Sequence, residues 1–242
     1  MIHEFSRTGM LIGETGLRAL EESRVAVFGV GGVGSHAIEA LARSGVGRLA
    51  LVDNDTVSLT NINRQSIALH STVGRYKTQV IKEKIADINP KCNVSTFETF
   101  VLPDNLEELF GQIGPVDYIL DAIDTVTAKL ALIVYAQSHD IPIVASMGTG
   151  NKLHPELFQI SDIYKTSVCP LCKVMRRELK ARQVKKLTVC WSPELPLTPG
   201  PTEEDTGARR ATPGSIAFVP PVAGYLMAAA VVGELTGYKY GK

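Results

Sequence analysis

Short apolar runs alternate with segments of helical periodicity over the first 150 residues. In residues 77–89, for example, Val80, Ile81 and Ile85 recur at the spacing of one helix face. The apolar runs predict strands at residues 25–28, 48–52, 94–100, 118–121 and 143–146. The periodic segments predict helices at residues 33–44, 77–89, 106–113 and 126–139. Strands separated by helices favour a mostly parallel sheet with helices on both faces, which is the α/β fold class.

The pattern changes after residue 150. It predicts strands at residues 156–163, 187–191 and 215–219, and a basic helix at residues 172–185. Between residues 193 and 214, five prolines and three glycines without periodicity predict a long crossover loop. The apolar segment 222–235 predicts a final helix that starts at Pro220-Pro221, a position that suits proline.

Residues 1–24 predict an N-terminal helical arm, with Leu11, Leu17 and Leu20 on a partial apolar face. We therefore expect a single domain over residues 1–242. It consists of the arm at 1–24, a core at 25–150 and a C-terminal extension at 151–242 that contains the loop 193–214.

Composition narrows the class of protein. The chain has 242 residues, of which 45% are hydrophobic and 21% charged, as expected for a globular protein with a proper core. A net charge of zero argues against a generic polyanion binder, so any nucleic-acid surface would be a local patch. No secretory leader is recognisable, and segment 222–235 is short for a membrane span. We expect no membrane association, and reduced cysteines in the cytoplasm.

A glycine-rich turn joins the first predicted strand to its helix and contains Gly29, Gly31, Gly32 and Gly34. Unpaired amides at a helix N-terminus attract anions, and glycines let the ligand approach the backbone. The order of strand, turn and helix predicts a Rossmann-like nucleotide site. Asp53, at the end of the second strand, stands where an acidic side chain can bind a ribose. These features fit an NAD enzyme as well as an ATP enzyme.

Cations downstream favour ATP. Arg64 and Lys77 lie on a loop and at a helix start that can face the same crevice, where they would balance charge on reacting phosphates. Asp124 follows the fourth strand and can hold Mg²⁺, while Asp121 can instead fix the end of that strand.

Together these motifs resemble the ThiF/MoeB superfamily of adenylating enzymes. The likeness covers about the first 150 residues and rests on the glycine turn, Asp53, Asn63-Arg64-Gln65, Lys77 and Asp121-Ala122-Ile123-Asp124. It implies that ATP is bound by the glycines, Asp53, Asn61, Asn63, Arg64, Gln65, Lys77 and Asp124, with magnesium on Asp124. It also implies a homodimer in which Arg7 enters the partner's ATP site. Arg64, Lys77, Asp124 and Arg7 would then be the catalytic residues.

The second half is similar to the tRNA threonylcarbamoyladenosine dehydratases of that superfamily. The likeness lies in segment 173–180, which reads KVMRRELK, and in segment 213–220, which reads PGSIAFVP. It implies that ATP adenylates the threonine carboxylate of a modified adenosine in tRNA. The neighbouring carbamoyl group then closes a ring and expels AMP. The resemblance thus implies tRNA as the substrate, and a sulfur-relay protein as a possible partner.

A basic cluster supports an RNA substrate independently. Eight of the residues from 165 to 186 are Lys or Arg, and Glu178 is the one acid among them. Helical spacing brings some of these cations together as candidate RNA contacts, namely Lys173, Arg176, Arg177 and Lys180. The alternative interpretation is a solvated helix face.

The cysteines point away from a zinc site. Cys169 and Cys172 have the spacing of a zinc knuckle, but the sequence contains one such pair, with Cys92 and Cys190 far from it. We expect no zinc. Cys190 lies in an apolar strand and fits a small buried residue better than a nucleophile.

Three other functions compete with the dehydratase hypothesis. A sulfur-carrier adenylyltransferase would use the same fold on a ubiquitin-like protein, but the incomplete cysteine set and the basic helix argue against it. A Rossmann NAD oxidoreductase would leave Arg64, Lys77 and Asp124 without a role. A non-catalytic RNA-binding or scaffold protein would tolerate replacement of Arg64 or Asp124.

Overall fold

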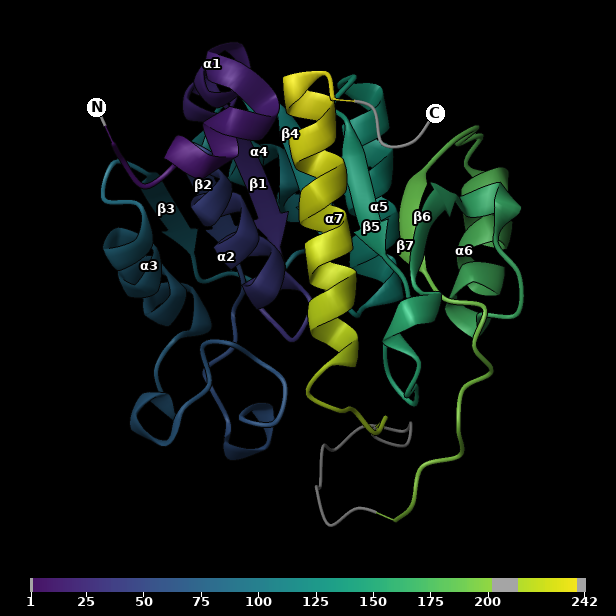
Figure 1. The fold of residues 1–242 in the computed structure, drawn as a ribbon. Coiled ribbons are helices and arrows are strands. Elements are labelled where there is room, and N and C mark those ends of the chain that lie inside the picture. The colour runs from purple at the N-terminus through teal and green to yellow at the C-terminus, as the bar shows by residue number, and fades with distance from the viewer. Residues whose placement is uncertain (1, 202–212, 239–242) are drawn as a thin grey trace.

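The computed structural model describes residues 2–201 and 213–238. Its centre is a seven-stranded sheet in the order β3-β2-β1-β4-β5-β7-β6 (Figure 1). The strands are β1 Arg24–Phe28, β2 Arg48–Val52, β3 Asn93–Phe97, β4 Tyr118–Asp121, β5 Ile143–Ser146, β6 Gln159–Asp162 and β7 Thr188–Trp191. All neighbours pair in parallel except β6 and β7, which are antiparallel. This arrangement confirms the expected mostly parallel α/β sheet with a C-terminal extension.

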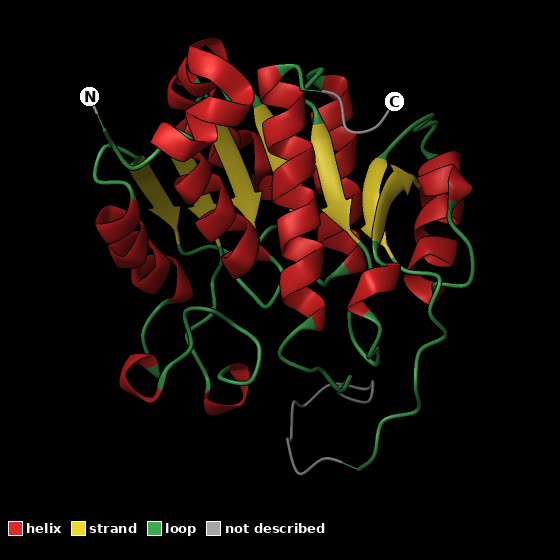
Figure 2. Cartoon of the chain, viewed as in Figure 1, coloured by secondary structure: helices red, strands yellow, loops and turns green. Residues whose placement is uncertain are grey.

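Helices cover both faces of the sheet (Figure 2). They are α1 Ser6–Glu22, α2 Gly34–Ser44, α3 Lys77–Ile88, α4 Leu106–Ile113, α5 Val126–Ser138, α6 Pro170–Ala181 and α7 Val219–Thr236. Residues of α2, α3 and α7 share one buried apolar cluster, and residues of α4 and α5 share another. A third cluster joins α5, α6 and β7 at the extended end of the sheet.

The strands read as continuous apolar runs because both of their faces are buried. In β1, Val25 and Val27 pack in the cluster of α2 and α7, whereas Ala26 and Phe28 pack in the cluster of α4 and α5. Alternate side chains thus serve opposite layers, which is typical of a parallel sheet.

Helix α7 is apolar on nearly all sides because it crosses the face of the sheet. Its length and composition would suit a membrane span, but half of its 18-residue window is buried within the fold. Gly224 allows α7 to approach α2 closely, because a Cβ on this residue would lie 2.4 Å from the Val33 carbonyl oxygen.

The structure corrects the predicted strand at residues 215–219. This segment does not pair with the sheet, and α7 already begins at Val219 with prolines in its first turn. The polar groups of the segment are held by loops instead. The Ser215 carbonyl accepts a hydrogen bond from the Asn63 side chain at 2.9 Å, and the Gly214 amide donates to Asn151 Oδ1 at 2.6 Å.

Other boundaries also differ from the prediction. Leu11 is exposed rather than packed, since Gly13 adopts a φ of 70° that interrupts α1, whereas Leu20 is buried. The strand predicted at 156–163 shrinks to β6, and the basic helix ends at Ala181. Within the predicted loop, residues 193–201 and 213–214 have no regular structure, and residues 202–212 lie outside the described part.

We predict that Gly224→Ala destabilises the protein by about 1–3 kcal/mol, because the new methyl group forces α7 away from α2. Gly111→Ala is the matched control. It lies in α4 with no described heavy atom within 4 Å of the place its methyl group would take, so its effect should be neutral or stabilising by about 0.5–1 kcal/mol. Urea unfolding measures both, and equal effects would contradict the proposed close packing.

Candidate functional site

A large pocket opens at the carboxyl ends of β1, β4 and β5, where the strand order reverses direction. Its cavity volume is about 750 Å³, within the range of ordinary ligand sites. One half is lined by the glycine turn, Arg64, Lys77 and Asp124. We call this the nucleotide half. The other half, which we call the acceptor half, is lined by segments 146–152, 169–171 and 213–215.

Close backbone packing explains two of the four glycines of the turn, Gly29 and Gly34. Gly29 has a φ of 90°, and a Cβ there would lie 2.7 Å from the Ala122 carbonyl oxygen. A Cβ on Gly34 would lie 1.8 Å from the Gly29 carbonyl oxygen, so α2 can start directly beneath the turn only with glycine here. Gly29, Gly31 and Gly32 line the pocket, whereas Gly34 lies behind them. The turn therefore exposes backbone to a ligand, as predicted for an anion site.

Asp53 connects the turn to the end of β2. Its carboxylate accepts hydrogen bonds from the amide of Val30 at 2.6 Å and from the amide of Asp55 at 2.8 Å. Burial raises the pKa of Asp53, and the nearby Lys77 and these amides oppose that shift. Asp53 also lines the pocket. It therefore shapes the turn and stands at the pocket wall.

Lys77 is a nearly buried cation at the first residue of α3, with 6% of its surface exposed. Its ammonium pairs with Asp55 Oδ2 at 2.7 Å, and both residues line the pocket. The pair keeps the ammonium compensated and fixed beside the cavity. A bound phosphate would give this cation a second anionic partner.

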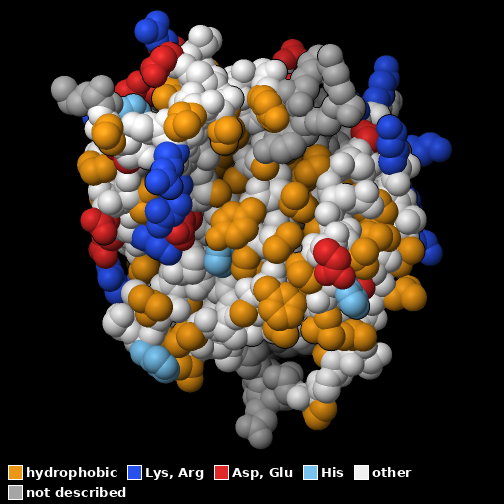
Figure 3. All heavy atoms as spheres, in the orientation of Figure 1, with side chains coloured by type: hydrophobic (Ala, Val, Ile, Leu, Met, Phe, Trp, Pro, Cys, Tyr) orange, Lys and Arg blue, Asp and Glu red, His pale blue; other side chains and the backbone are white. Residues whose placement is uncertain are grey.

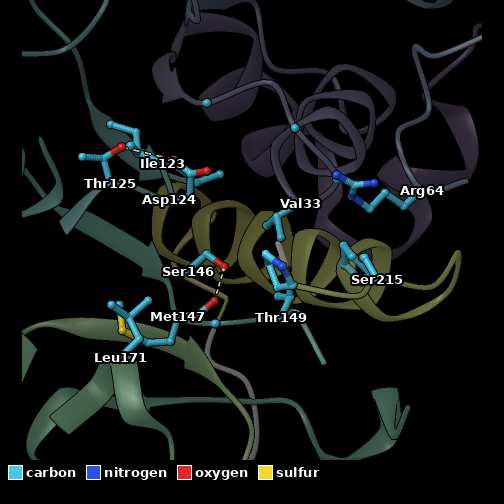
Figure 4. A pocket seen from close by; sticks show the side chains of 18 of the residues that line it. Val33, Arg64, Ile123, Asp124, Thr125, Ser146, Met147, Thr149, Leu171 and Ser215 are labelled. Atoms are coloured by element: carbon cyan, nitrogen blue, oxygen red, sulfur yellow. Dashed lines mark hydrogen bonds between the residues drawn. The ribbon is translucent and has the colours of Figure 1, made fainter. Parts of the chain in front are cut away.

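Arg64 is oriented by its own loop. Its Nη1 donates to the Thr60 carbonyl at 2.9 Å and to Asn63 Oδ1 at 2.8 Å. Figure 4 shows the guanidinium reaching the cavity from the side opposite Asp124. Asn63 does not line the pocket, so the structure gives it a supporting position between Arg64 and Ser215.

Asn61 and Gln65 are both buried and line the pocket. Asn61 Oδ1 accepts the amide of Ser58 at 3.1 Å and thereby shapes the loop before Arg64. Gln65 Oε1 is buried without a hydrogen-bond partner among the described residues. An unsatisfied amide oxygen in a pocket wall is typical of a group that awaits a ligand or water.

A buried ion pair fixes the loop after β4. Lys129 Nζ lies 2.9 Å from Asp121 Oδ2, with both side chains fully buried, and it also donates to the Ile123 carbonyl at 3.0 Å. The Ile123 amide donates to Asp121 Oδ1 at 3.1 Å. Burial raises the pKa of Asp121, while Lys129 acts to lower it. Asp121 is thus the structural residue, and Asp124 is left at the pocket wall.

The nucleotide half is suited to a magnesium ion. Asp124 is exposed in the pocket, its contact being the Thr125 hydroxyl at 3.3 Å, and no cation pairs with it among the described residues. Mg²⁺ in nucleotide sites takes one or two carboxylates and completes its shell with water and phosphate oxygens. In the described part of the chain, no cluster of three or more His, Cys, Asp or Glu has an arrangement for metal binding.

Loops from distant parts of the sequence form the acceptor half. Asn151 has a φ of 59°, and its backbone pairs with Gly214 and Leu197 at 2.8 Å each. The Glu194 carboxylate accepts the amides of Leu153 and His154, at 2.8 Å and 3.2 Å. In Figure 4, Ser146, Thr149 and Ser215 lie along one side of the cavity, below Asp124 and Arg64 in this view. Hydroxyl groups and loop backbone thus surround this part of the cavity.

Sequence reasoning missed Lys129 and the acceptor half. Lys129 had a signal, since it is the one charged residue in the apolar stretch 126–138. The individual residues of the acceptor half had none, because they come together only through the antiparallel pair of β6 and β7, which α6 separates in sequence, and through the final loop.

Arg7 and the Lys and Arg side chains of α6 lie outside the pocket lining. Arg7 is exposed on α1. Phe5, two residues earlier, lies beside the C-terminal end of α2, where a Cβ on Gly45 would be 3.6 Å from its ring. Helix α6 begins at the acceptor half and runs away from it. Lys173, Arg177 and Lys180 are exposed on α6, whereas the half-buried Arg176 donates to the Thr166 carbonyl at 3.0 Å.

The cysteines are buried or half-buried. Cys190 packs in the core, where burial raises its pKa to about 12, in line with the interpretation as a small buried residue. Cys169 and Cys172 lie together at the start of α6, and Cys169 lines the acceptor half.

Comparison with known proteins gives concordant matches. The ThiF family pattern matches residues 5–242. The chain is 46% identical over 244 residues to a tRNA threonylcarbamoyladenosine dehydratase of Bacillus subtilis, covering 97% of this chain and 95% of that relative. It is 42% identical over 177 residues to the Escherichia coli enzyme of the same name, covering 73% of this chain and 65% of the relative.

A solved structure of E. coli tRNA N6-threonylcarbamoyladenosine dehydratase in complex with ATP is similar along nearly the whole chain. The TM-score is 0.86 at 34% identity, and the match covers 97% of this chain and 94% of the other.

We predict that Lys129→Met lowers stability by about 3–5 kcal/mol, because it leaves the Asp121 carboxylate buried without its cation. The double variant Lys129→Met with Asp121→Asn removes that charge and should recover a substantial part of the loss. Denaturant unfolding of the two variants and the parent measures the coupling. Additive losses would show that the ion pair does not stabilise this loop.

Proposed function

The chain belongs to the ThiF family, and we propose that it is an ATP-dependent tRNA threonylcarbamoyladenosine dehydratase. The observation that carries this proposal is the shared pocket. The glycine turn, Arg64, Lys77 and Asp124 surround one cavity that continues into an acceptor half, within a chain 46% identical to a dehydratase of that name.

The nucleotide half is suited to bind the triphosphate of ATP. The backbone of the glycine turn faces the phosphates, Asp53 faces the ribose, and Arg64 and Lys77 supply positive charge from two other elements. In-line attack on a phosphate builds negative charge on its oxygens, so cations fixed in advance lower the barrier. Asn61 and Gln65 complete this wall, and Asn63 keeps Arg64 in position.

The acceptor half would hold the threonylcarbamoyl group of the modified adenosine. Its threonine carboxylate attacks the α-phosphate of ATP, the bond to pyrophosphate breaks, and an acyl adenylate forms. The carbamoyl group of the same side chain then attacks the activated carbonyl, and AMP leaves. Because both reacting groups belong to one side chain, intramolecular positioning can supply up to about 7–11 kcal/mol. The protein therefore needs no thiol nucleophile.

Magnesium would bind at Asp124. The exposed carboxylate lies at the carboxyl end of β4, facing the space that the phosphates would occupy. When bound, the ion would neutralise phosphate charge and orient the leaving pyrophosphate. Asp121 and Lys129 hold the loop that presents Asp124, and neither is offered as a ligand.

The exposed cations of α6 are the proposed tRNA contact. Lys and Arg side chains gather at the edge of the molecule where Figure 1 places α6, as Figure 3 shows. The helix starts at the acceptor half, so tRNA phosphates along it would bring a nucleoside toward the pocket. Arg176 is the weakest of the four candidates, because it already donates to Thr166.

A homodimer would give Arg7 its role. Arg7 cannot be assigned to the pocket of its own chain, whose lining does not include it. The same helix exposes Met10 and Leu11 at 84% and 83%, which favours contact with another copy. Arg7 of one copy would then complete the other's site. The cytoplasmic location and a sulfur-relay partner stay predictions.

We predict that Arg64→Ala slows formation of AMP and of the cyclised nucleoside by about 10²–10³-fold, because it removes charge stabilisation at the phosphates. The substrates are ATP, Mg²⁺ and tRNA that carries threonylcarbamoyladenosine. The control is Arg43→Ala, an exposed arginine on α2 that pairs with Glu39 and lies outside the pocket lining. Its rate should match that of the parent.

A second variant tests the metal proposal in the same assay. Asp124→Asn should require a higher Mg²⁺ concentration for half-maximal rate, because a carboxylate ligand is lost. Unchanged rates in both Arg64→Ala and Asp124→Asn would contradict the proposed site. Consumption of NAD in place of ATP would support the oxidoreductase alternative instead.

Replacing the exposed α6 cations Lys173, Arg177 and Lys180 with Ala should weaken tRNA binding. It should also reduce the slope of log affinity against log salt by about two to three, one per lost phosphate contact. The control replaces Arg18, Lys82 and Lys91, which changes the net charge equally elsewhere. Filter-binding titrations at several salt concentrations measure both, and identical slopes would return α6 to a solvated face.

A further inference from the structure

The structure assigns Cys169 and Cys172 as a redox-active dithiol, which exchanges with a low-molecular-weight disulfide and closes to an intramolecular disulfide in the wall of the acceptor half. This inference goes beyond the proposed function. Only its predicted effect on turnover rests on that function.

The position of the pair in the fold is the first argument. Cys169 is the N-cap of α6, and Cys172 lies in the first turn, three residues on. The amide of Lys173 donates to the Cys169 carbonyl at 3.1 Å, so Cys169 is already joined to the helical turn. Residues at this spacing in a helix have Cβ atoms close enough for a disulfide to form after a small adjustment. Cys-x-x-Cys at a helix start is the arrangement of dithiol redox sites.

The surroundings of the two thiols differ in the way that exchange requires. The Cys172 thiol and the backbone amides of Cys172, Gly148 and Leu171 donate toward Cys169, which lowers its pKa to about 5. Cys172 is fully buried, and the same hydrogen bond raises its pKa. Cys169 lines the pocket with 2% of its surface exposed, whereas Cys172 is fully buried outside that lining, so Cys169 would be the attacking thiolate and Cys172 the resolving thiol. Cys92 and Cys190 are different, because burial raises the pKa of each to about 12.

Strained backbone directly precedes the pair. Val168 has a φ of 61°, a conformation that β-branched residues rarely adopt, and the Cys169 amide donates back to the Ser167 carbonyl at 2.5 Å. Strain of this kind persists at sites where a local conformation has a function. Here the turn places the Cys169 thiol against the Gly148 amide at the pocket wall.

The chemistry balances with a disulfide as the oxidant. The Cys169 thiolate attacks one sulfur of the small disulfide, whose sulfur–sulfur bond breaks and releases one thiolate. Cys172 gives its proton to that thiolate and attacks the Cys169 sulfur, expelling the second. The second thiolate takes up from water the proton that Cys169 had released, so two protein thiols are oxidised to a disulfide and the small disulfide is reduced to two thiols.

Oxidation would change the acceptor half. When the disulfide forms, the Cys169 sulfur is no longer negatively charged, and the hydrogen bond that it accepts from the Gly148 amide is weakened or lost. Gly148 begins the segment 148–152, in which Asn151 fixes Leu197 and Gly214. The cations of the nucleotide half come from other elements, the loop after β2 and the start of α3. We therefore expect the disulfide to slow the reaction of the acceptor and to leave ATP binding unchanged.

The test uses the full chain with oxidised glutathione as the probe. The protein is reduced, desalted, equilibrated with the probe, unfolded, alkylated and digested with trypsin. The peptide of residues 166–173 carries both cysteines, because Lys165 and Lys173 flank it. It should lose the mass of two hydrogens and take no alkyl group. Cys92 and Cys190 should be alkylated, and they serve as internal controls.

Two variants separate the steps. Cys172→Ser should retain one glutathione on Cys169, because the resolving thiol is gone, whereas Cys169→Ser should retain none on Cys172. Alkylation of both cysteines in the parent peptide would overturn the proposal. A second result would also overturn it: both thiols resist alkylation until a chelator is added, and the peptide mass shows no loss of two hydrogens. That result would identify a pair of metal ligands.

The effect on turnover is measured separately. Oxidised protein should form the cyclised nucleoside at least about tenfold more slowly than reduced protein, with recovery in dithiothreitol, while the turnover of Cys169→Ser does not change on addition of the probe. ATP-induced thermal stabilisation should be equal in both redox states. If the reduced protein forms no AMP, the proposed function fails, while the peptide masses still decide the dithiol. Equal turnover in both states would overturn the link to the acceptor half.

Discussion

The reversal of strand order between β1 and β4 is the constraint on which the site depends. β1 pairs with β2 on one side and β4 on the other, and the helices that follow β1 and β4 cover opposite faces of the sheet. The chain therefore leaves the carboxyl ends of β1 and β4 toward opposite faces of the sheet, and a crevice forms between the two connections. Gly29 and Gly34 bring the turn into backbone contact at this point, where any side chain would collide with a carbonyl group. These two contacts fix the backbone of the glycine turn at the bottom of the pocket, where we propose that an anion binds.

Two ion pairs near the glycine turn differ in how deeply they are buried. The Lys129–Asp121 pair is fully buried, and both side chains also hydrogen-bond to the backbone of Ile123, which holds the end of β4. The Lys77–Asp55 pair lies at the pocket wall, with the carboxylate largely exposed, so its cation can take a second anion. Arg64 is oriented by neutral partners alone among the described residues. The buried pair thus fixes the loop after β4, and under the proposed function Arg64 and Lys77 would supply positive charge to the phosphates.

The sequence predicted the sheet, its helices and the nucleotide half, because these follow from local signals. Apolar runs are continuous where both faces are buried, and the glycine turn, Asp53 and Asp124 closely follow the strands β1, β2 and β4. The strand expected at 215–219 was wrong. Asn63 and Asn151, both remote in sequence, hydrogen-bond instead to Ser215 and to the preceding Gly214. The acceptor half could not be predicted, because it forms only when the final loop meets the segment after β5. Leu11 was misplaced because one glycine interrupts α1.

The central claim is that an acid in the acceptor half attacks the α-phosphate of ATP held by the glycine turn. Its most direct measurement follows one atom. Threonylcarbamoyladenosine tRNA labelled with a heavy oxygen isotope in the threonine carboxylate is incubated with ATP and the protein, and the products are weighed by mass spectrometry. The account predicts one heavy oxygen in AMP, together with the cyclised nucleoside. Heavy oxygen in inorganic phosphate with release of ADP, or unlabelled AMP, would contradict it.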